Sequence, residues 1–266
     1  MTGVPLLRLA VILLCLACAM RATLAAEVLE TEPRPGVTLR MLADVPADAK
    51  AIAMLFPGGA GMVRIDADGR FRGTKRNFLT RSRDLFIAAG IGTALVDAPS
   101  DQWDEDGLTY ARRMAPARAG EIRLAIARLR ETWPGRKIWL VGTSRGTLDA
   151  ASAAATLGDK GPDGLVLTST IGRDGKQGGT VLDLALDRIA VPVLLVHHAN
   201  DGCAVTPPEA APRIRNRLTG APAAELVMMD GGDSGHGRAC DATTHHGFLG
   251  IEGKAIRAIA AWIGSR

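Results

Sequence analysis

Aromatic residues are scarce in this sequence, at 4% of its 266 positions. Surfaces that bind carbohydrates or single-stranded nucleic acids stack their ligands on aromatic rings, so the composition argues against both classes. The formal net charge is only +4 and the basic residues form no stripe, which also disfavours a nucleic-acid partner. The chain lacks G-x-G-x-x-G and G-x-x-x-x-G-K, so neither a dinucleotide site nor a P-loop is expected.

The sequence also lacks an apolar run long enough to span a membrane comfortably. Its apolar segment at 9–19 follows Arg8 and ends shortly before the small residues around Ala25. This order is typical of a secretory signal peptide. We therefore expect residues 1–26 to be removed, and residues 27–266 to be periplasmic or secreted with no stable membrane partner.

Cysteine is rare as well, with four residues in the chain. Two of them lie in the expected signal peptide, where Cys18 leaves a lipoprotein anchor open although Cys15 replaces the usual aliphatic residue. The other two, Cys203 and Cys240, form an even pair in an oxidising compartment, which predicts a disulfide. Two cysteines do not make a metal site, so no metal is expected.

Apolar residues, in contrast, are abundant at 47%, and short apolar segments alternate with helical patterns. We predict strands at 37–42, 50–56, 92–97, 138–141, 164–169, 191–197 and 224–229, and helices at 77–89, 117–133, 147–157, 208–218 and 247–262. This alternation predicts a doubly wound, mostly parallel α/β sheet. No repeat, low-complexity tract or linker interrupts it, so residues 27–266 are expected to form a single domain.

The expected helix at 117–133 is amphipathic. Ile122, Ile126 and Leu129 share one face, and Glu121 lies among the charged residues of the other. The pattern predicts a helix that packs on the sheet and turns Glu121 to solvent.

The stretch KIWLVGTSRGTLD at 137–149 carries the strongest functional signal. A short apolar strand leads into the pentapeptide GTSRG centred on Ser144, and an alanine-rich helix follows. This is the order of a nucleophile elbow, in which small glycines let the strand and the helix approach. Such an elbow holds Ser144 above the carboxyl edge of a parallel sheet and at a helix N-terminus, which favours developing negative charge.

A serine nucleophile needs a base to take its proton, and the base needs an acid to orient it. In hydrolases with this elbow the acid follows the serine and the histidine comes last. Asp201 follows the expected strand at 191–197, and His246 lies between the last expected strand and the last expected helix. The other candidates are Asp230, Asp233 and Asp241 for the acid, and His245 and His236 for the base.

Over residues 45–264 the chain resembles the α/β-hydrolases, in particular a group of secreted bacterial members with poorly defined substrates. The resemblance rests on GTSRG, on HHANDGC around Asp201 and on HHGF around His246. It implies that Ser144 is the nucleophile, Asp201 the acid and His246 the base.

The resemblance also ranks the histidines. In family members the last helix opens directly after the catalytic histidine, and we expect this helix to open at Gly247-Phe248, which favours His246. His245 is then expected to be a loop residue in solvent. His197 and His198 are expected to pack at a strand end or to support the loop that carries the acid.

An oxyanion hole requires two backbone N–H groups. The resemblance assigns one to Arg145, the residue after the nucleophile. It assigns the other to the glycine-rich loop after the strand at 50–56, where we name Gly59 and Ala60. The histidine usual in this loop is replaced by Pro57.

Two long loops flank the expected site. The basic residues of the first loop are Arg64, Arg70, Arg72, Lys75 and Arg76. They either attract an anionic substrate or, as we favour, form a solvated basic loop. The second loop, at 98–115, contains Trp103 and Tyr110, each of which either walls the site or anchors its own loop. The connection at 169–191 is too short for a large lid.

The expected activity is hydrolysis of a carboxylic ester through an acyl-enzyme on Ser144, without a cofactor. A thioester or an amide is a less favoured substrate. The alternatives are a serine peptidase or amidase on the same fold, and a non-catalytic binding protein that kept the fold. A small-molecule ester is the expected partner, and the sequence carries no signal for an oligomeric state.

Overall fold

The computed structural model describes residues 26–176 and 178–266. The expected signal peptide, apart from Ala26, and the lipoprotein alternative at Cys18 lie outside the described residues. No helix within these two ranges combines the length and the hydropathy that a membrane crossing requires.

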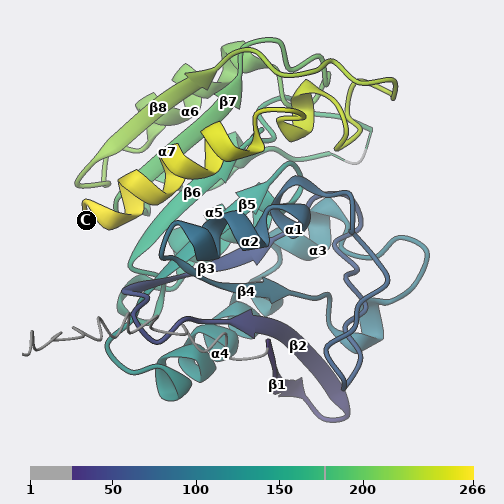
Figure 1. Ribbon diagram of the computed structural model, residues 1–266, viewed down its shortest axis with the longest axis vertical. Helices are drawn as coiled ribbons and strands as arrows, with labels where there is room; N and C mark the ends of the chain where they lie inside the picture. Colours follow the sequence, from purple (N-terminus) through teal and green to yellow (C-terminus); the bar gives the residue numbers. More distant parts are fainter. Residues whose placement is uncertain (1–25, 177) are drawn as a thin grey trace, which may run out of the picture.

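One sheet of eight strands organises the described part of the chain (Figure 1). The strands are β1 (Glu27–Arg34), β2 (Val37–Asp44), β3 (Ala51–Phe56), β4 (Gly92–Val96), β5 (Lys137–Thr143), β6 (Gly164–Thr168), β7 (Val193–His198) and β8 (Ala224–Met229). Their order across the sheet is β1-β2-β4-β3-β5-β6-β7-β8. The pairs β1–β2 and β2–β4 are antiparallel and all others are parallel. The predicted mostly parallel sheet is confirmed, and the carboxyl ends of β3 to β8 meet at one edge.

Helices cover both faces of this sheet. In the described residues they are α1 (Phe78–Arg81), α2 (Arg83–Ala88), α3 (Tyr110–Met114), α4 (Pro116–Thr132), α5 (Gly146–Thr156), α6 (Ala211–Arg217) and α7 (Glu252–Gly264). Residues of α4, α5 and α6 enter one core, and residues of α1, α2 and α7 enter the other (Figure 1). Between β6 and β7 the described residues contain two short 3₁₀ turns, Val181–Asp183 and Leu186–Arg188, and they form no lid domain.

The central strands feed both cores because successive side chains point to opposite faces. In β5, Ile138 and Leu140 enter the core under α4 and α5, whereas Trp139 and Val141 enter the core under α7. All four side chains are fully buried. This explains why the strands are continuous apolar runs rather than alternating ones.

The last helix begins later than expected. His245–Gly247 form a 3₁₀ turn, Phe248 adopts a left-handed conformation with φ 58°, and α7 begins only at Glu252. A left-handed residue cannot continue a right-handed helix, and the buried ring of Phe248 packs on Phe78 with centroids 4.7 Å apart. The prediction that Gly247-Phe248 opens the helix is therefore wrong.

The predicted exposure of Glu121 is also wrong, because its side chain is only 3% exposed. Glu121 accepts a hydrogen bond from Arg118 at 3.0 Å and another from Arg34 of β1. Paired guanidinium groups offset the cost of burying this carboxylate. Helical periodicity identifies the faces of α4 but not the arginine that β1 brings to it.

Candidate active site

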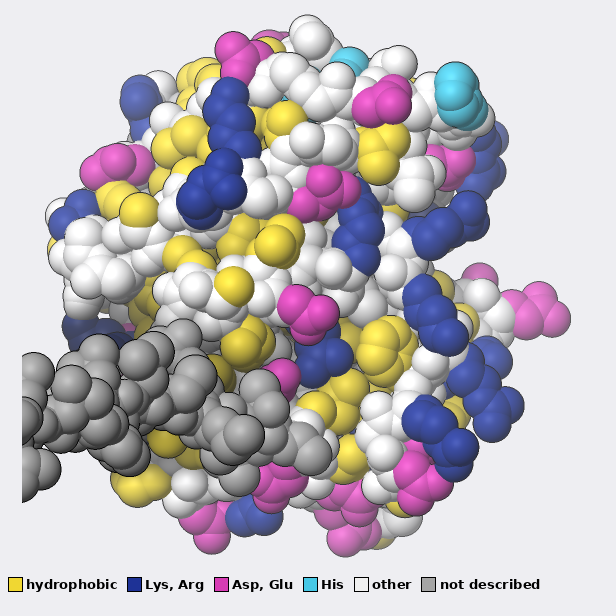
Figure 2. Space-filling view, viewed as in Figure 1, with side chains coloured by type: hydrophobic (Ala, Val, Ile, Leu, Met, Phe, Trp, Pro, Cys, Tyr) yellow, Lys and Arg dark blue, Asp and Glu magenta, His cyan; other side chains and the backbone are white. Residues whose placement is uncertain are grey.

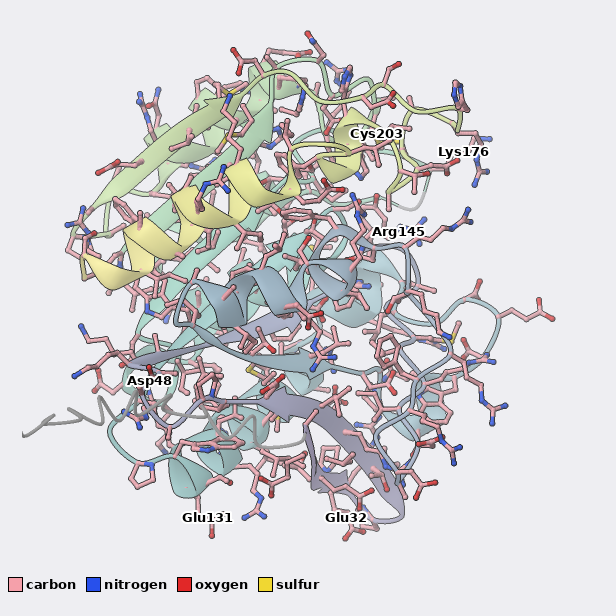
Figure 3. The ribbon with its side chains drawn as sticks, viewed as in Figure 1. Glu32, Asp48, Glu131, Arg145, Lys176 and Cys203 are labelled. Atoms are coloured by element: carbon pink, nitrogen blue, oxygen red, sulfur yellow. A yellow bond between two sulfur atoms is a disulfide. The ribbon has the colours of Figure 1, made fainter. Side chains whose placement is uncertain are left out.

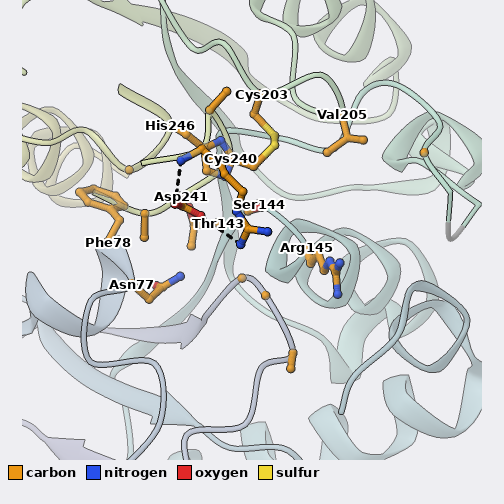
Figure 4. Close-up of a pocket in the computed structure, with 18 of the residues that line it drawn as sticks. Asn77, Phe78, Thr143, Ser144, Arg145, Cys203, Val205, Cys240, Asp241 and His246 are labelled. Atoms are coloured by element: carbon orange, nitrogen blue, oxygen red, sulfur yellow. Dashed lines mark hydrogen bonds and ion pairs between the residues drawn. A yellow bond between two sulfur atoms is a disulfide. The ribbon is translucent and has the colours of Figure 1, made fainter. Parts of the chain in front are cut away.

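An open hollow of about 1000 Å³ lies at the carboxyl edge of the sheet, where the sequence places the candidate residues. Ser144, His246 and Cys203 line it, as do the glycine-rich loop after β3 and residues of the segment that leads to His246 (Figure 4). Asp201 lies behind His246 and is 5% exposed. The structure thus brings the predicted nucleophile, acid and base to one site.

Ser144 occupies a strained turn between β5 and α5. Its φ is 52°, a left-handed value that costs a non-glycine residue of order 1–3 kcal/mol. The turn is held because Ser144 N donates to Thr168 O at 3.0 Å and Thr147 N donates to Ser144 O at 2.9 Å. A Cβ on Gly146 would lie 2.7 Å from the carbonyl carbon of Phe56, so this glycine lets α5 reach β3. Ser144 Oγ makes no hydrogen bond within the described residues.

Asp201 orients His246 from the end of β7. The Nδ1 atom of His246 lies 3.0 Å from Asp201 Oδ2 and 3.3 Å from Oδ1. His246 is 4% exposed, and its Nε2 has no hydrogen-bond partner in the described part of the chain. With Nδ1 turned to the acid, Nε2 is the ring atom available to a group in the hollow.

The charge on Asp201 is favoured by its surroundings. Burial would raise the pKa of this carboxyl, but hydrogen bonds from His246, from the Cys203 N–H at 2.9 Å and from the Thr206 hydroxyl at 2.9 Å outweigh burial. The pKa of Asp201 is held below its ordinary value as a result. The residue is therefore a stable carboxylate at neutral pH.

Two hydroxyl residues that sequence reasoning missed help to place His246. Thr206 Oγ1 lies 3.1 Å from His246 Nδ1 in addition to its bond with Asp201. Ser169, at the end of β6, donates from Oγ to His246 O at 2.7 Å. Neither belongs to a motif, and only the meeting of strand ends at one edge reveals them.

The rival acids and bases have other partners or none. Asp230 pairs with Lys254, Asp233 accepts from Gly235 N at 2.8 Å, and Asp241 accepts from Arg238 N at 2.8 Å. His236 is exposed and makes no hydrogen bond to the described residues. None of the four contacts Ser144 or His246 through a hydrogen bond or ion pair in the described ranges.

His245 does not lie free in solvent as expected. It is half-buried, and its ring stacks on His198 with centroids 4.4 Å apart. His198 Nδ1 accepts from Asn200 N at 3.0 Å, so its Nε2 carries the proton and donates to Gly231 O at 2.8 Å. These two histidines thus pack the strand end, as the sequence suggested for His198.

The candidate oxyanion groups are free to bind a ligand. The N–H groups of Gly59, Ala60 and Arg145 donate to no acceptor within the described residues, and all three residues line the hollow. Gly58 lies against the elbow, since a Cβ there would be 2.8 Å from Ser144 Cβ. The absence of a side chain at Gly58 brings this loop close to the serine.

A buried arginine, also missed from the sequence, supports the glycine-rich loop. Arg113 of α3 is 1% exposed and donates to Pro57 O at 3.2 Å and Gly59 O at 3.1 Å. It pairs as well with Asp149 in the first turn of α5. Arg113 therefore ties the candidate oxyanion loop to the helix that begins at the elbow.

The aromatic residues of the second loop have different roles. Trp103 Nε1 donates to Ala98 O at 3.0 Å, so this side chain anchors its own loop. Tyr110 lines the hollow and is 4% exposed. Trp103 thus anchors its own loop, and Tyr110 forms part of the wall of the hollow.

The structure contains the predicted disulfide between Cys203 and Cys240. It links the loop of Asp201 to the segment that precedes His246, and it closes a loop of 37 residues. Replacing both cysteines by alanine is expected to lower the free energy of unfolding by about 3–4 kcal/mol, because the unfolded chain gains loop entropy. The double variant also loses the covalent tie between the loop of Asp201 and the segment that precedes His246.

Denaturant titration of the double variant beside the wild type measures the stability change. Digestion of the unreduced wild type followed by mass spectrometry is the control, and it should return a linked Cys203–Cys240 peptide. Two alkylatable thiols in the unreduced protein would show that no bridge forms.

His197 gives the protein a pH-dependent stability. Its side chain is fully buried, Nε2 accepts from Thr170 N at 2.8 Å, and Nδ1 has no partner among the described residues. Burial, opposed by the charge of Asp201, lowers the pKa of His197 from 6.5 to about 4. Between these values the unfolded chain binds a proton that the native protein does not.

The contribution of neutral, buried His197 to the free energy of unfolding is therefore complete above about pH 6.5. It is lost as the pH falls to about 4, and the total change in the free energy of unfolding is roughly 3 kcal/mol. Urea unfolding of wild type and His197→Gln at several pH values between 4 and 7 measures it. The wild type should lose more stability on acidification than the variant. Parallel curves for the two proteins would assign the pH dependence to other groups.

Comparison with known proteins gives a fold but no family. No family model matches the sequence, and no curated protein matches it. Dienelactone hydrolase from Anabaena variabilis superposes with a TM-score of 0.63 and 17% identity, covering 91% of this chain and 99% of that one. Est1E from Butyrivibrio proteoclasticus, determined with bound ferulic acid, superposes with a TM-score of 0.59 and 16% identity, covering 90% of this chain and 100% of that one. An α/β serine hydrolase without a lid from Xanthomonas campestris superposes with a TM-score of 0.55 and 16% identity, covering 88% of this chain and 94% of that one.

Proposed function

Because this chain has the α/β-hydrolase fold, we propose that it is a serine hydrolase that cleaves a carboxylic ester through an acyl-enzyme. One observation carries the proposal. The 3.0 Å contact between His246 Nδ1 and Asp201 lies at the same hollow as a serine held at φ 52°. An acid, a base and a strained serine at one open site are the parts that acyl transfer requires.

The proposed reaction has two halves. His246 Nε2 takes the proton of Ser144 Oγ as this oxygen attacks the ester carbonyl, and the imidazolium then donates the proton to the departing alcohol. The N–H of Arg145 and that of Gly59 or Ala60 stabilise the tetrahedral oxyanion. In the second half His246 takes a proton from a water molecule as this water attacks the acyl-enzyme. The imidazolium then returns the proton to Ser144 Oγ as the bond between Oγ and the acyl carbon breaks and the acid leaves. No step draws on a cofactor.

We further propose that residues 1–26 are a signal peptide and that residues 27–266 are the exported domain. The Cys203–Cys240 disulfide supports this, because such bridges persist in oxidising compartments. The order of Arg8, the apolar segment at 9–19 and the small residues around Ala25 also supports it.

A panel of p-nitrophenyl esters of rising acyl length, with a thioester and an anilide of the same acyl group, tests the proposal. We expect turnover of the esters to exceed that of the anilide. Faster turnover of the anilide would favour the peptidase or amidase alternative. No turnover of any member, with intact folding, would favour a binding protein.

A further inference from the structure

Basic side chains outnumber acidic ones around the hollow. Arg145, Lys176 and Arg238 line it, and the sole carboxylate among its described lining residues is Asp241. Asp241 already accepts a hydrogen bond from Arg238 N at 2.8 Å and lies 3.5 Å from the guanidinium of the same residue. Arg145 and Lys176 form no ion pair with any residue of the described ranges, so the hollow carries an excess of positive charge.

The excess extends beyond the hollow. A neighbouring depression of about 420 Å³ shares Asp241 with it and is lined by Arg72, Lys75 and Arg76. These three side chains also lack ion pairs within the described part of the chain. Lys and Arg side chains gather on the right of the molecule in Figure 2, the side on which Figure 3 labels Arg145 and Lys176. A positive field of this kind raises the local concentration of anions.

Arg145 is the cation nearest the proposed reaction in sequence, since it follows Ser144 directly. Its guanidinium carbon lies 5.3 Å from the ring centroid of Tyr110, which limits the freedom of the half-buried side chain. The nearby buried carboxylate, Asp149, is already paired with Arg113 and Arg118. The Arg145 guanidinium is therefore held in place by Tyr110, and no carboxylate of the described residues pairs with it.

We propose that the hollow takes an ester that carries a carboxylate, and that the Arg145 side chain binds this group. The inference rests on the proposed function, because it names the substrate class of the same site. A guanidinium binds a carboxylate through two parallel hydrogen bonds, and Lys176 with the basic residues around the mouth attracts the anion. The side chain of Arg145 thus sets the specificity for a charged ester, while its backbone N–H donates a hydrogen bond to the oxyanion.

The test compares charged and neutral esters of matched size. Mono-p-nitrophenyl glutarate is paired with p-nitrophenyl hexanoate, and 4-carboxyphenyl acetate with 4-methylphenyl acetate, so that the charge lies on the acyl part or on the alcohol part. The readout is the ratio of kcat/KM for the charged ester to that for its neutral partner. This ratio cancels any loss of folded or active enzyme.

The wild type is expected to prefer the charged member of at least one pair. Arg145→Gln should reduce that ratio by about ten- to hundredfold, the range expected for hydrogen bonds to a charged group, and Arg145→Lys should restore part of it. Raising the salt concentration should lower the ratio in the wild type. Arg173→Gln is the matched control, because Arg173 pairs with Glu209 and does not line the hollow, so its ratio should equal that of the wild type.

Two results separate this inference from the proposed function. Hydrolysis of neutral esters that depends on Ser144, without preference for either charged ester, would overturn the inference and leave the function standing. A preference that Arg145→Gln does not reduce would also overturn it. Failure to cleave any of the four esters would overturn both.

Discussion

Replacing Ser144 by alanine is expected to lower kcat for ester hydrolysis by a factor on the order of a million, the loss seen when a serine protease loses its nucleophile. Without Oγ no acyl-enzyme forms, and only binding and the oxyanion donors remain. Stability should not fall, because Ser144 Oγ makes no hydrogen bond within the described residues and the turn is held by backbone atoms.

Ser152→Ala is the matched control, since this serine lies on α5 away from the hollow. Its kcat should equal that of the wild type. If Ser144→Ala keeps a kcat within about tenfold of the wild type instead of the expected loss, another residue attacks the ester.

Replacing Asp201 by asparagine is expected to lower kcat by about ten-thousandfold, the effect of the equivalent change in a serine protease. The amide no longer selects the His246 tautomer with its proton on Nδ1, and it no longer stabilises the imidazolium. His246→Ala should reduce kcat at least as far. Steady-state kinetics of both variants measure these losses.

His245→Ala and His236→Ala are the controls for the base, and Asp230→Asn is the control for the acid. All three should retain kcat within about tenfold, because in the described part of the chain their side chains form no hydrogen bond or ion pair with Ser144 or His246. A severe loss in His236→Ala together with a mild one in His246→Ala would reverse the choice of base.

The sequence predicts the sheet and the elbow well, because both depend on local patterns. The apolar segment at 138–141 lies within β5, and GTSRG forms the turn between β5 and α5. The order of serine, acid and histidine then leads to Asp201 and His246, which the structure brings within 3.0 Å. Each of these inferences uses residues near one another in sequence, or strand ends that a parallel sheet must align.

What the sequence does not predict depends on contacts between distant segments. Thr206 and Ser169 lie far from His246 in the chain, and no motif marks them. Arg113 lies in what the sequence suggests to be a loop, yet it is buried beneath the glycine-rich loop. The late start of α7 follows from the left-handed backbone at Phe248, whose ring packs on Phe78.

The central claim is that Ser144 is a nucleophile activated by His246, and reaction with a fluorophosphonate measures it most directly. The probe forms a covalent bond only with an activated serine, and peptide mapping locates the adduct. The account predicts one labelled peptide, which contains Ser144, and labelling that is abolished in His246→Ala. An adduct on a different serine, or labelling of Ser144 at the same rate without His246, would contradict it.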